Sequence, residues 1–223
     1  RSFGFNLQRT KTDNTDTVSD YEADRIGLDY SYGLPMTESN RFFLALKYLK
    51  WDIRKTTNSP DEIIDFIALN GDKFDNFSLN VTYTIDTRDS RSFTRSGFKT
   101  SLGTEVFVPG SDLEYYKVTF RTDSYFLINK ERDIILRLKG LTKYGQGYAG
   151  QKGLPFYDKF RTGGPKSVRG YEKNSLSPLD SRGNALGGDF AVAGSAEVIF
   201  KPPLDMKSLR SAFFVDFGRA YKD

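Results

Sequence analysis

Apolar and polar residues alternate with a period of two along most of this chain. The clearest case is 76–88, where Phe77, Leu79 and Ile85 belong to an apolar series and Asn80 and Thr82 to the polar series between them. Such alternation is typical of a β-strand with one apolar and one polar face. The pattern predicts about nine antiparallel strands, at 1–12, 25–34, 41–53, 76–88, 98–108, 116–128, 131–145, 190–200 and 212–221.

One segment between the third and fourth predicted strands has a helical pattern instead. Ser59, Pro60 and Glu62 form a helix start signal, with the serine as N-cap and the glutamate three residues after it. Apolar residues follow at helical spacing, and Gly71 closes the segment. We expect a helix of a few turns in an outer loop, either packed on its neighbours as a plug or lying on a membrane or a partner.

Alternation alone does not separate a soluble sandwich from a membrane barrel, because both have strands with one apolar face. Three features favour the barrel. The predicted strands are roughly 10 to 15 residues long, their connections alternate between short and long, and aromatic residues lie near the strand ends. We therefore predict an all-β, antiparallel transmembrane β-barrel wall, with apolar faces toward lipid and polar faces toward the lumen.

The composition agrees with this prediction. Only 38% of the 223 residues are hydrophobic, yet 15% are aromatic. This pairing suits strands that place aromatic side chains at a membrane interface. There is no apolar run of about 18 residues, so no transmembrane helix is expected. The chain opens directly on a strand pattern without a visible signal peptide, and we expect it to be a piece of a longer protein.

The residue types that are absent exclude several kinds of chemistry. The chain has no Cys and no His, which removes disulfides, thiolate nucleophiles, the Ser-His-Asp arrangement and most zinc sites. The acidic segment 12–24 lacks the spacing of a calcium-binding loop. The net charge of +4 comes from interspersed charges, which indicates a mixed polar surface rather than nucleic-acid binding. We expect no catalytic residue, no metal and no cofactor.

The longest interruption of the strand pattern is a loop at about 152–188. It contains two glycine pairs and a short motif, which are Gly163-Gly164, Gly187-Gly188 and Val168-Arg169-Gly170-Tyr171. Glycine adopts backbone conformations closed to other residues, so the chain can fold back sharply there. A loop this long in a compact fold is usually functional or disordered, and the glycine-rich frame of the motif predicts an ordered one.

Several segments together resemble a known family. They are Phe156–Phe160, Gly163–Tyr171, Asp86–Asp89 with Ser96-Gly97, Pro109–Asp112 with Glu114–Val118, Ala196-Glu197 and Phe214–Gly218. These segments resemble the BamA family, the central subunits of the bacterial outer-membrane β-barrel assembly machinery. The Val-Arg-Gly-Tyr core is shared with a wider superfamily that includes two-partner-secretion transporters and the translocation module TamA. The resemblance covers nearly the whole chain.

The resemblance implies a sixteen-stranded barrel in the bacterial outer membrane, preceded by POTRA domains. Residues 1–223 would then be a partial barrel domain of about nine strands, roughly the fifth to the thirteenth. The POTRA domains and the first and last strands, which form the lateral gate of such proteins, would be absent. The implied partners are outer-membrane lipids, lipoproteins of the assembly machinery and nascent outer-membrane barrel proteins.

The resemblance also implies that the long loop enters the lumen and that its arginine pairs with acidic groups of the wall. Glu197 and Asp216 lie on the polar faces of two neighbouring predicted strands, so both are expected to point inward. The planar guanidinium of Arg169 can bind a carboxylate through two parallel hydrogen bonds, which a lysine cannot. Tyr171 is expected to pack, and Gly170 to let the backbone approach the wall. The alternative is that Arg169 is solvated and both acids are ordinary lumen charges.

Three functions remain open from the sequence. The first is a non-enzymatic factor that folds and inserts β-barrel proteins into the outer membrane. The second is a related two-partner-secretion or TamA-type translocation barrel, or a passive pore. The third, an outer-membrane barrel enzyme, is disfavoured because such enzymes use a histidine and none is present.

Overall fold

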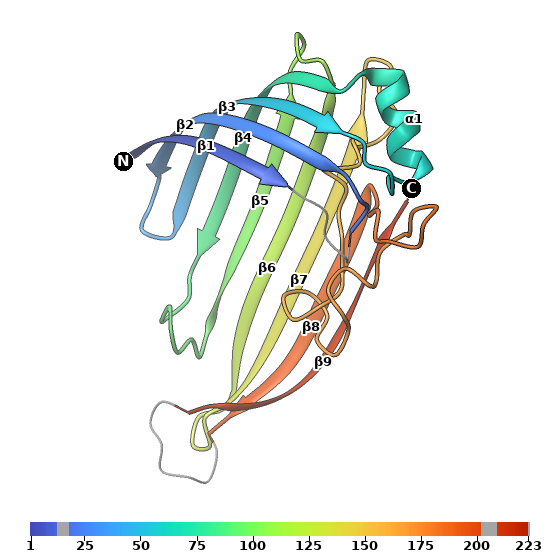
Figure 1. The fold of residues 1–223 in the computed structure, drawn as a ribbon. Coiled ribbons are helices and arrows are strands. Elements are labelled where there is room, and N and C mark those ends of the chain that lie inside the picture. The colour runs from blue at the N-terminus through green and yellow to red at the C-terminus, as the bar shows by residue number, and fades with distance from the viewer. Residues whose placement is uncertain (13–17, 202–208, 223) are drawn as a thin grey trace.

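The computed structural model describes residues 1–12, 18–201 and 209–222. These residues form one antiparallel sheet of nine strands, in which every strand pairs with the next along the chain (Figure 1). The elements are β1 (Ser2–Thr12), β2 (Glu22–Pro35), β3 (Asn40–Arg54), α1 (Asp61–Asn70), β4 (Lys73–Asp86), β5 (Gly97–Phe107), β6 (Tyr115–Asn129), β7 (Ile134–Gly147), β8 (Phe190–Phe200) and β9 (Ser211–Tyr221). The all-β antiparallel fold predicted from the alternation is confirmed.

The sheet is strongly curved, and the long connection after β7 lies against its concave side near β7, β8 and β9 (Figure 1). Connections from odd-numbered strands meet at one end of the sheet, called the loop end, and comprise 13–21, 55–72, 108–114 and 148–189. Connections from even-numbered strands meet at the opposite end, called the turn end, and comprise 36–39, 87–96, 130–133 and 201–210.

The strict alternation of short and long connections expected from the sequence is wrong at one place. The connection 108–114 at the loop end is shorter than 87–96 at the turn end. Its turn folds back over the neighbouring strand β4, where the backbone N–H of Phe77 donates to Ser111 Oγ at 2.9 Å. This connection is therefore short because it bonds directly to an adjacent strand.

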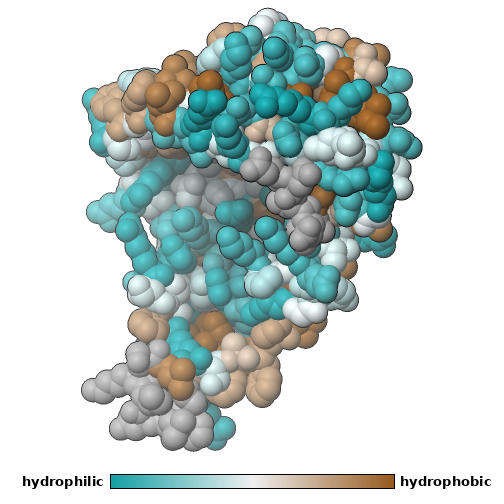
Figure 2. All heavy atoms as spheres, in the orientation of Figure 1, coloured by the Kyte–Doolittle hydropathy of each residue, from teal (hydrophilic) through white to brown (hydrophobic). Residues whose placement is uncertain are grey.

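The two faces of the sheet differ in the way the alternation predicts. On β4, Phe77 and Leu79 are exposed on the convex face, whereas Ser78 between them is buried on the concave face. On β9, Phe213 is 74% exposed and Val215 72% exposed, values that a water-soluble protein rarely shows for neighbouring large apolar residues. Figure 2 shows hydrophilic residues gathered in the hollow of the concave side. An apolar exterior around a polar interior is the pattern of a membrane barrel.

Aromatic pairs mark both margins of the convex face. Three pairs lie toward the turn end and three toward the loop end of their strands: Phe3–Tyr32, Phe42–Tyr83 and Phe200–Phe213, and Tyr48–Phe77, Tyr116–Tyr144 and Phe190–Tyr221. Each pair has ring centroids 4.9 to 6.2 Å apart and joins two adjacent strands. Two aromatic rows that enclose an apolar band correspond to the interfacial girdles of outer-membrane barrels.

A compact apolar core closes the loop end. Ile63 of α1 is completely buried, and Phe66 packs edge to face on Phe156 of the long loop with ring centroids 5.2 Å apart. Trp51 of β3 stacks on Tyr157 at 4.3 Å. The helix is therefore packed on its neighbours, as the plug interpretation expected. No helix among the described residues is long and apolar enough to cross a membrane.

The start of the helix differs from the prediction. The helix begins at Asp61, and its N-cap residue is Pro60, which provides no side-chain cap. The hydroxyl of Ser59 instead donates to the carbonyl oxygen of Asp20 at 2.9 Å. Glu62 accepts hydrogen bonds from the backbone N–H and the hydroxyl of Ser181, at 3.1 and 3.0 Å. The residues of the expected capping box are thus used to hold the helix against other segments.

Candidate functional site

The long loop has its own hydrogen-bonded structure before it meets the wall. The backbone N–H groups of Ser167 and Val168 both donate to the carbonyl oxygen of Gly164 at 3.0 Å, which closes a tight turn. The N–H of Gly163 donates to the hydroxyl of Ser167 at 2.9 Å. Gly163 has a φ of +115°, and a Cβ there would lie 2.7 Å from a neighbouring carbonyl oxygen, so this position favours glycine. The turn presents Arg169 to the sheet.

The structure brings Arg169 together with Glu197 and Asp216. The guanidinium donates to both carboxylate oxygens of Asp216, from Nε and from Nη2, each at 2.7 Å. Nη2 also donates to Glu197 Oε1 at 2.7 Å and to Ser195 Oγ at 2.9 Å, and the backbone N–H of Arg169 donates to Asp216 at 2.9 Å. Beneath the guanidinium lies the ring of Phe214, 3.5 Å away. The guanidinium is held by carboxylates at its edge and by the Phe214 ring beneath its face, so it has little freedom to move.

The register of β8 and β9 explains why the two acids converge. Ser195 pairs directly with Asp216, and Glu197 follows two residues later on the same face of β8. Both carboxylate side chains are almost completely buried, with 5% and 4% exposed, whereas the Arg169 side chain is 29% exposed. The acids are thus held by the sheet, and the arginine is delivered to them by the loop.

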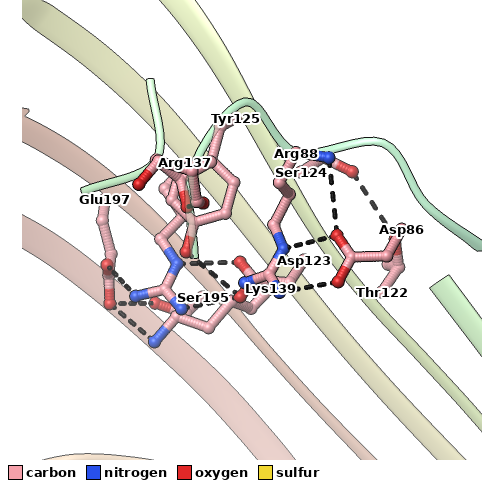
Figure 3. A network of polar contacts seen from close by, with 12 residues as sticks. Asp86, Arg88, Thr122, Asp123, Ser124, Tyr125, Arg137, Lys139, Ser195 and Glu197 are labelled. Atoms are coloured by element: carbon pink, nitrogen blue, oxygen red, sulfur yellow. Dashed lines mark hydrogen bonds and ion pairs between the residues drawn. The ribbon is translucent and has the colours of Figure 1, made fainter. Parts of the chain in front are cut away.

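The charge network extends further than the sequence analysis foresaw (Figure 3). Arg137 of β7 donates to both carboxylate oxygens of Asp123 at 2.8 and 2.7 Å and to Glu197 at 3.2 Å. Lys139 also contacts Glu197 at 2.8 Å. Arg137 and Lys139 lie on the same face of β7, and that face alone does not show which acids they reach. Glu197 is therefore shared by three cations from β7 and the loop.

The remaining motif residues have roles that differ in part from the expectation. Val168 is 1% exposed and packs on β9, where a Cβ on Gly218 would lie 2.9 Å from Val168 Cγ2. Gly170 has a φ of +86°, but a Cβ added there would meet no atom within 4 Å, so this glycine serves the turn and not a close approach to the wall. Tyr171 is 53% exposed, and the expected packing of its ring is wrong.

A second set of contacts fixes the part of the loop before the motif. Lys117 of β6 bridges Asp158 at 2.7 Å and Glu105 of β5 at 3.0 Å. Lys159 contacts Asp189 at 2.7 Å across the two ends of the loop. Burial raises the pKa of the Tyr157 hydroxyl well above its ordinary value, so this side chain is a neutral packing group. The loop is therefore joined to the wall at two places, through Asp158 and through Arg169.

These side chains form ion pairs and hydrogen bonds with one another. Among residues 1–12, 18–201 and 209–222, no group of three or more acidic side chains is arranged to hold a metal ion. The fold and the anchored loop together define a class: this is the wall of a transmembrane β-barrel whose longest loop folds into the lumen.

The family follows from comparison with known proteins. All of residues 1–223 match the model of the Omp85 superfamily domain. The chain belongs to the Omp85 superfamily of outer-membrane barrels.

Individual relatives agree with this assignment. The chain is 28% identical over 219 residues to the outer membrane protein assembly factor BamA of Neisseria meningitidis, covering 92% of this chain and 27% of that protein. It is 25% identical to the BamA of Nitratidesulfovibrio vulgaris, covering 91% of this chain and 25% of that protein. A SAM50-like protein of Schizosaccharomyces pombe is 30% identical over 148 residues, covering 63% of this chain and 30% of that protein.

A solved structure supports the same fold. The crystal structure of BamA from Haemophilus ducreyi lacking POTRA domains 1–3 superimposes with a TM-score of 0.89 at 22% identity, covering 99% of this chain and 46% of that chain. The chain therefore spans about a quarter to a third of the length of the curated relatives and less than half of the solved structure.

Proposed function

We propose that this chain is the central part of the barrel of an outer-membrane protein assembly factor. The complete protein folds and inserts β-barrel proteins into the bacterial outer membrane without catalysing a chemical reaction. The observation that carries the proposal is the loop anchored by Arg169 to Glu197 and Asp216, since this is the motif by which the sequence resembles the BamA family. The two BamA relatives, each matched over more than nine-tenths of this chain, support the same choice.

The anchored loop gives the proposal a physical basis. An assembly factor must keep its own barrel in a defined shape while client strands fold beside it. Ion pairs from the loop to β6, β8 and β9 brace the concave wall from within, at Lys117 and at Arg169. Because Glu197 and Asp216 are almost completely buried, breaking their pairs with Arg169 costs more than breaking exposed ion pairs does.

The place of the chain in the whole protein is also part of the proposal. The nine strands correspond to about the fifth to the thirteenth of sixteen, with the loop end toward the cell exterior. POTRA domains and the gate-forming terminal strands belong to the parts of the complete protein outside residues 1–223. Its partners are outer-membrane lipids, lipoproteins of the assembly machinery and nascent barrel proteins. The chain matches less than half of the solved structure, which agrees with its being part of a larger barrel protein.

A two-partner-secretion or TamA-type translocation barrel is the competing function, and a passive pore is the third. A loop fixed inside the lumen by paired charges narrows the passage that a pore would need, which favours assembly over free conduction. Neither competing function is favoured by a particular contact among the described residues.

The test is complementation with the full-length protein. Cells depleted of the native copy receive Arg169→Ala, Arg169→Lys or, as a control, Arg9→Ala, which removes an exposed arginine from the outer surface. We expect both Arg169 variants to reduce the amount of folded client barrels, measured by heat-modifiable migration, while the control does not. A protein whose depletion leaves client barrels intact but stops export of one secreted substrate would contradict the proposal.

A further inference from the structure

Two cations of the concave wall stand next to each other without a carboxylate. Arg121 of β6 pairs with Leu141, and Lys143 of β7 pairs with Thr119, so the two cations are diagonal neighbours on one face. Within residues 1–12, 18–201 and 209–222, neither forms an ion pair with an acidic side chain. The ammonium nitrogen of Lys143 lies 5.4 Å from the centre of the Phe160 ring.

The cations on either side of this pair each have a carboxylate partner. Lys117 has Glu105 at 3.0 Å and Asp158 at 2.7 Å, and Lys139 has Glu197 at 2.8 Å. The nearby carboxylates are therefore already engaged. Adjacent like charges on a sheet face are unfavourable, so Arg121 and Lys143 form a positive patch on this part of the wall.

The two cations face two neighbouring cavities. A cavity of about 320 Å³ between the loop and the wall is lined by Arg121, Lys139 and Lys166, and a second of about 250 Å³ is lined by Arg121 and Lys143. Because the two cavities share Arg121, they follow one another along the wall. Their neutral lining includes the small residues Ser101, Gly103, Ala193 and Gly194 beside the larger Leu141 and Phe160. The carboxylates that also line them, Asp123, Asp216 and Glu105, are each paired with a cation. We call this space the basic groove.

We propose that the basic groove binds an acidic segment of a polypeptide in the lumen. Carboxylates of that segment would pair with Arg121 and Lys143 and, at the loop, with Lys166. Two successive cavities that share a wall residue accommodate an extended chain with several negative side chains, whereas a single small anion would occupy only one of them. Arg169 and Asp216 of the anchor also line the first cavity, so the groove lies beside the anchor pairs. Binding through Arg121 and Lys143 uses neither of those side chains and does not depend on the proposed assembly function.

The experiment uses the full-length protein in lipid nanodiscs with fluorescent hexaglutamate, and hexaglutamine as the neutral probe. Binding is measured by fluorescence anisotropy at low ionic strength for the unmodified protein and for Arg121→Gln/Lys143→Gln. The matched control is Lys50→Gln/Arg54→Gln, which removes two exposed cations outside the groove. We expect the groove variant to bind hexaglutamate at least about tenfold more weakly and the control to bind it unchanged, because each lost ion pair reduces affinity.

Two further measurements keep the result independent of folding defects. Arg121→Lys retains the charge and should retain most of the binding. Carbodiimide coupling should join a hexaglutamate carboxylate to the Lys143 amine, which mass spectrometry can locate. The proposal is overturned if hexaglutamate binds no better than hexaglutamine, or if inorganic phosphate displaces it at equal concentration. It is also overturned if Lys143 remains unmodified while exposed lysines such as Lys50 react.

Discussion

The sharpest prediction concerns the free energy with which the long loop is held in the lumen. Replacing Arg169 by alanine removes two charge-assisted hydrogen bonds to Asp216 and one to Glu197. It leaves the carboxylate of Asp216, 4% exposed, without any other ion-pair partner among the described residues. Glu197 loses one contact but keeps Arg137 and Lys139. The main cost is therefore one buried carboxylate deprived of its cation.

The size of this cost lies between two known limits. Exposed ion pairs contribute about 0–1 kcal/mol, while removal of one partner from a buried pair costs about 3–5 kcal/mol. The carboxylate is buried but the guanidinium is 29% exposed, so water can partly replace it. We expect Arg169→Ala to destabilise the docked loop by about 2–3 kcal/mol, which raises the population of the released loop by about 30- to 150-fold.

Limited proteolysis measures that population. Lys166 and Lys173 are exposed in the docked loop, but a lysine-specific protease needs a locally unfolded segment, so cleavage there should quicken as the released fraction rises. A double-mutant cycle of Arg169→Ala with Asp216→Ala should show coupling of at least about 1 kcal/mol, while the exposed pair Arg9 and Asp24, at 3.3 Å, should show almost none. Effects of the Arg169 and Asp216 changes that add within about 0.5 kcal/mol would refute the reasoning.

Three further predictions test other parts of the structure. Single cysteines scanned over 77–85 in the complete protein should alternate between lipid-accessible and water-accessible labelling, and uniform labelling would contradict the assignment of faces. Gly218→Ala should raise the cleavage rate of the loop about tenfold, since a Cβ there would lie 2.8 Å from the carbonyl oxygen of Val192 and 2.9 Å from Val168 Cγ2 and would disturb the contact of the loop with the wall; an unchanged rate would show that this contact does not hold the loop. Burial raises the pKa of the Glu62 carboxyl, but hydrogen bonds from its own backbone and from Ser181 outweigh this and lower the pKa below its ordinary value. The contact should therefore stabilise α1 at neutral pH and be lost as pH falls through that lowered pKa, so hydrogen exchange of α1, corrected for its intrinsic rate, should quicken in acid in the native protein but not in Glu62→Gln.

Strands and faces were predictable because their signal is local. Each residue of 76–88 shows its face through its nearest neighbours along the chain, and β4 was found at Lys73–Asp86 accordingly. The helix was predictable for the same reason, since its apolar spacing is contained within one segment. Its capping was not, because Ser59 and Glu62 bond to Asp20 and Ser181, which are far away in the sequence.

The site was predictable only in part, from the alternation of residues between the two faces of each strand and from the family resemblance. The alternation placed Glu197 and Asp216 on the inner face, and the family motif directed attention to Arg169. Neither indicated that Arg137 would bridge Asp123 and Glu197, because that contact depends on the register of three strands. The exposure of Tyr171 was missed for a related reason: a motif residue next to a buried anchor need not itself be buried.

The anchor formed by Arg169 also has a consequence for how the sheet reaches its correct pairing. Strands β8 and β9 could slip past one another during folding. A slip of one residue would turn Asp216 to the lipid side, and a slip of two would carry it about 6.6 Å along β8, beyond hydrogen-bond range of a guanidinium that also holds Glu197. Only the observed register lets one side chain satisfy both acids. Docking of the loop therefore acts as a check on strand alignment: a misaligned wall leaves Asp216 without its cation and the loop free, a state that quality-control proteases can recognise and remove.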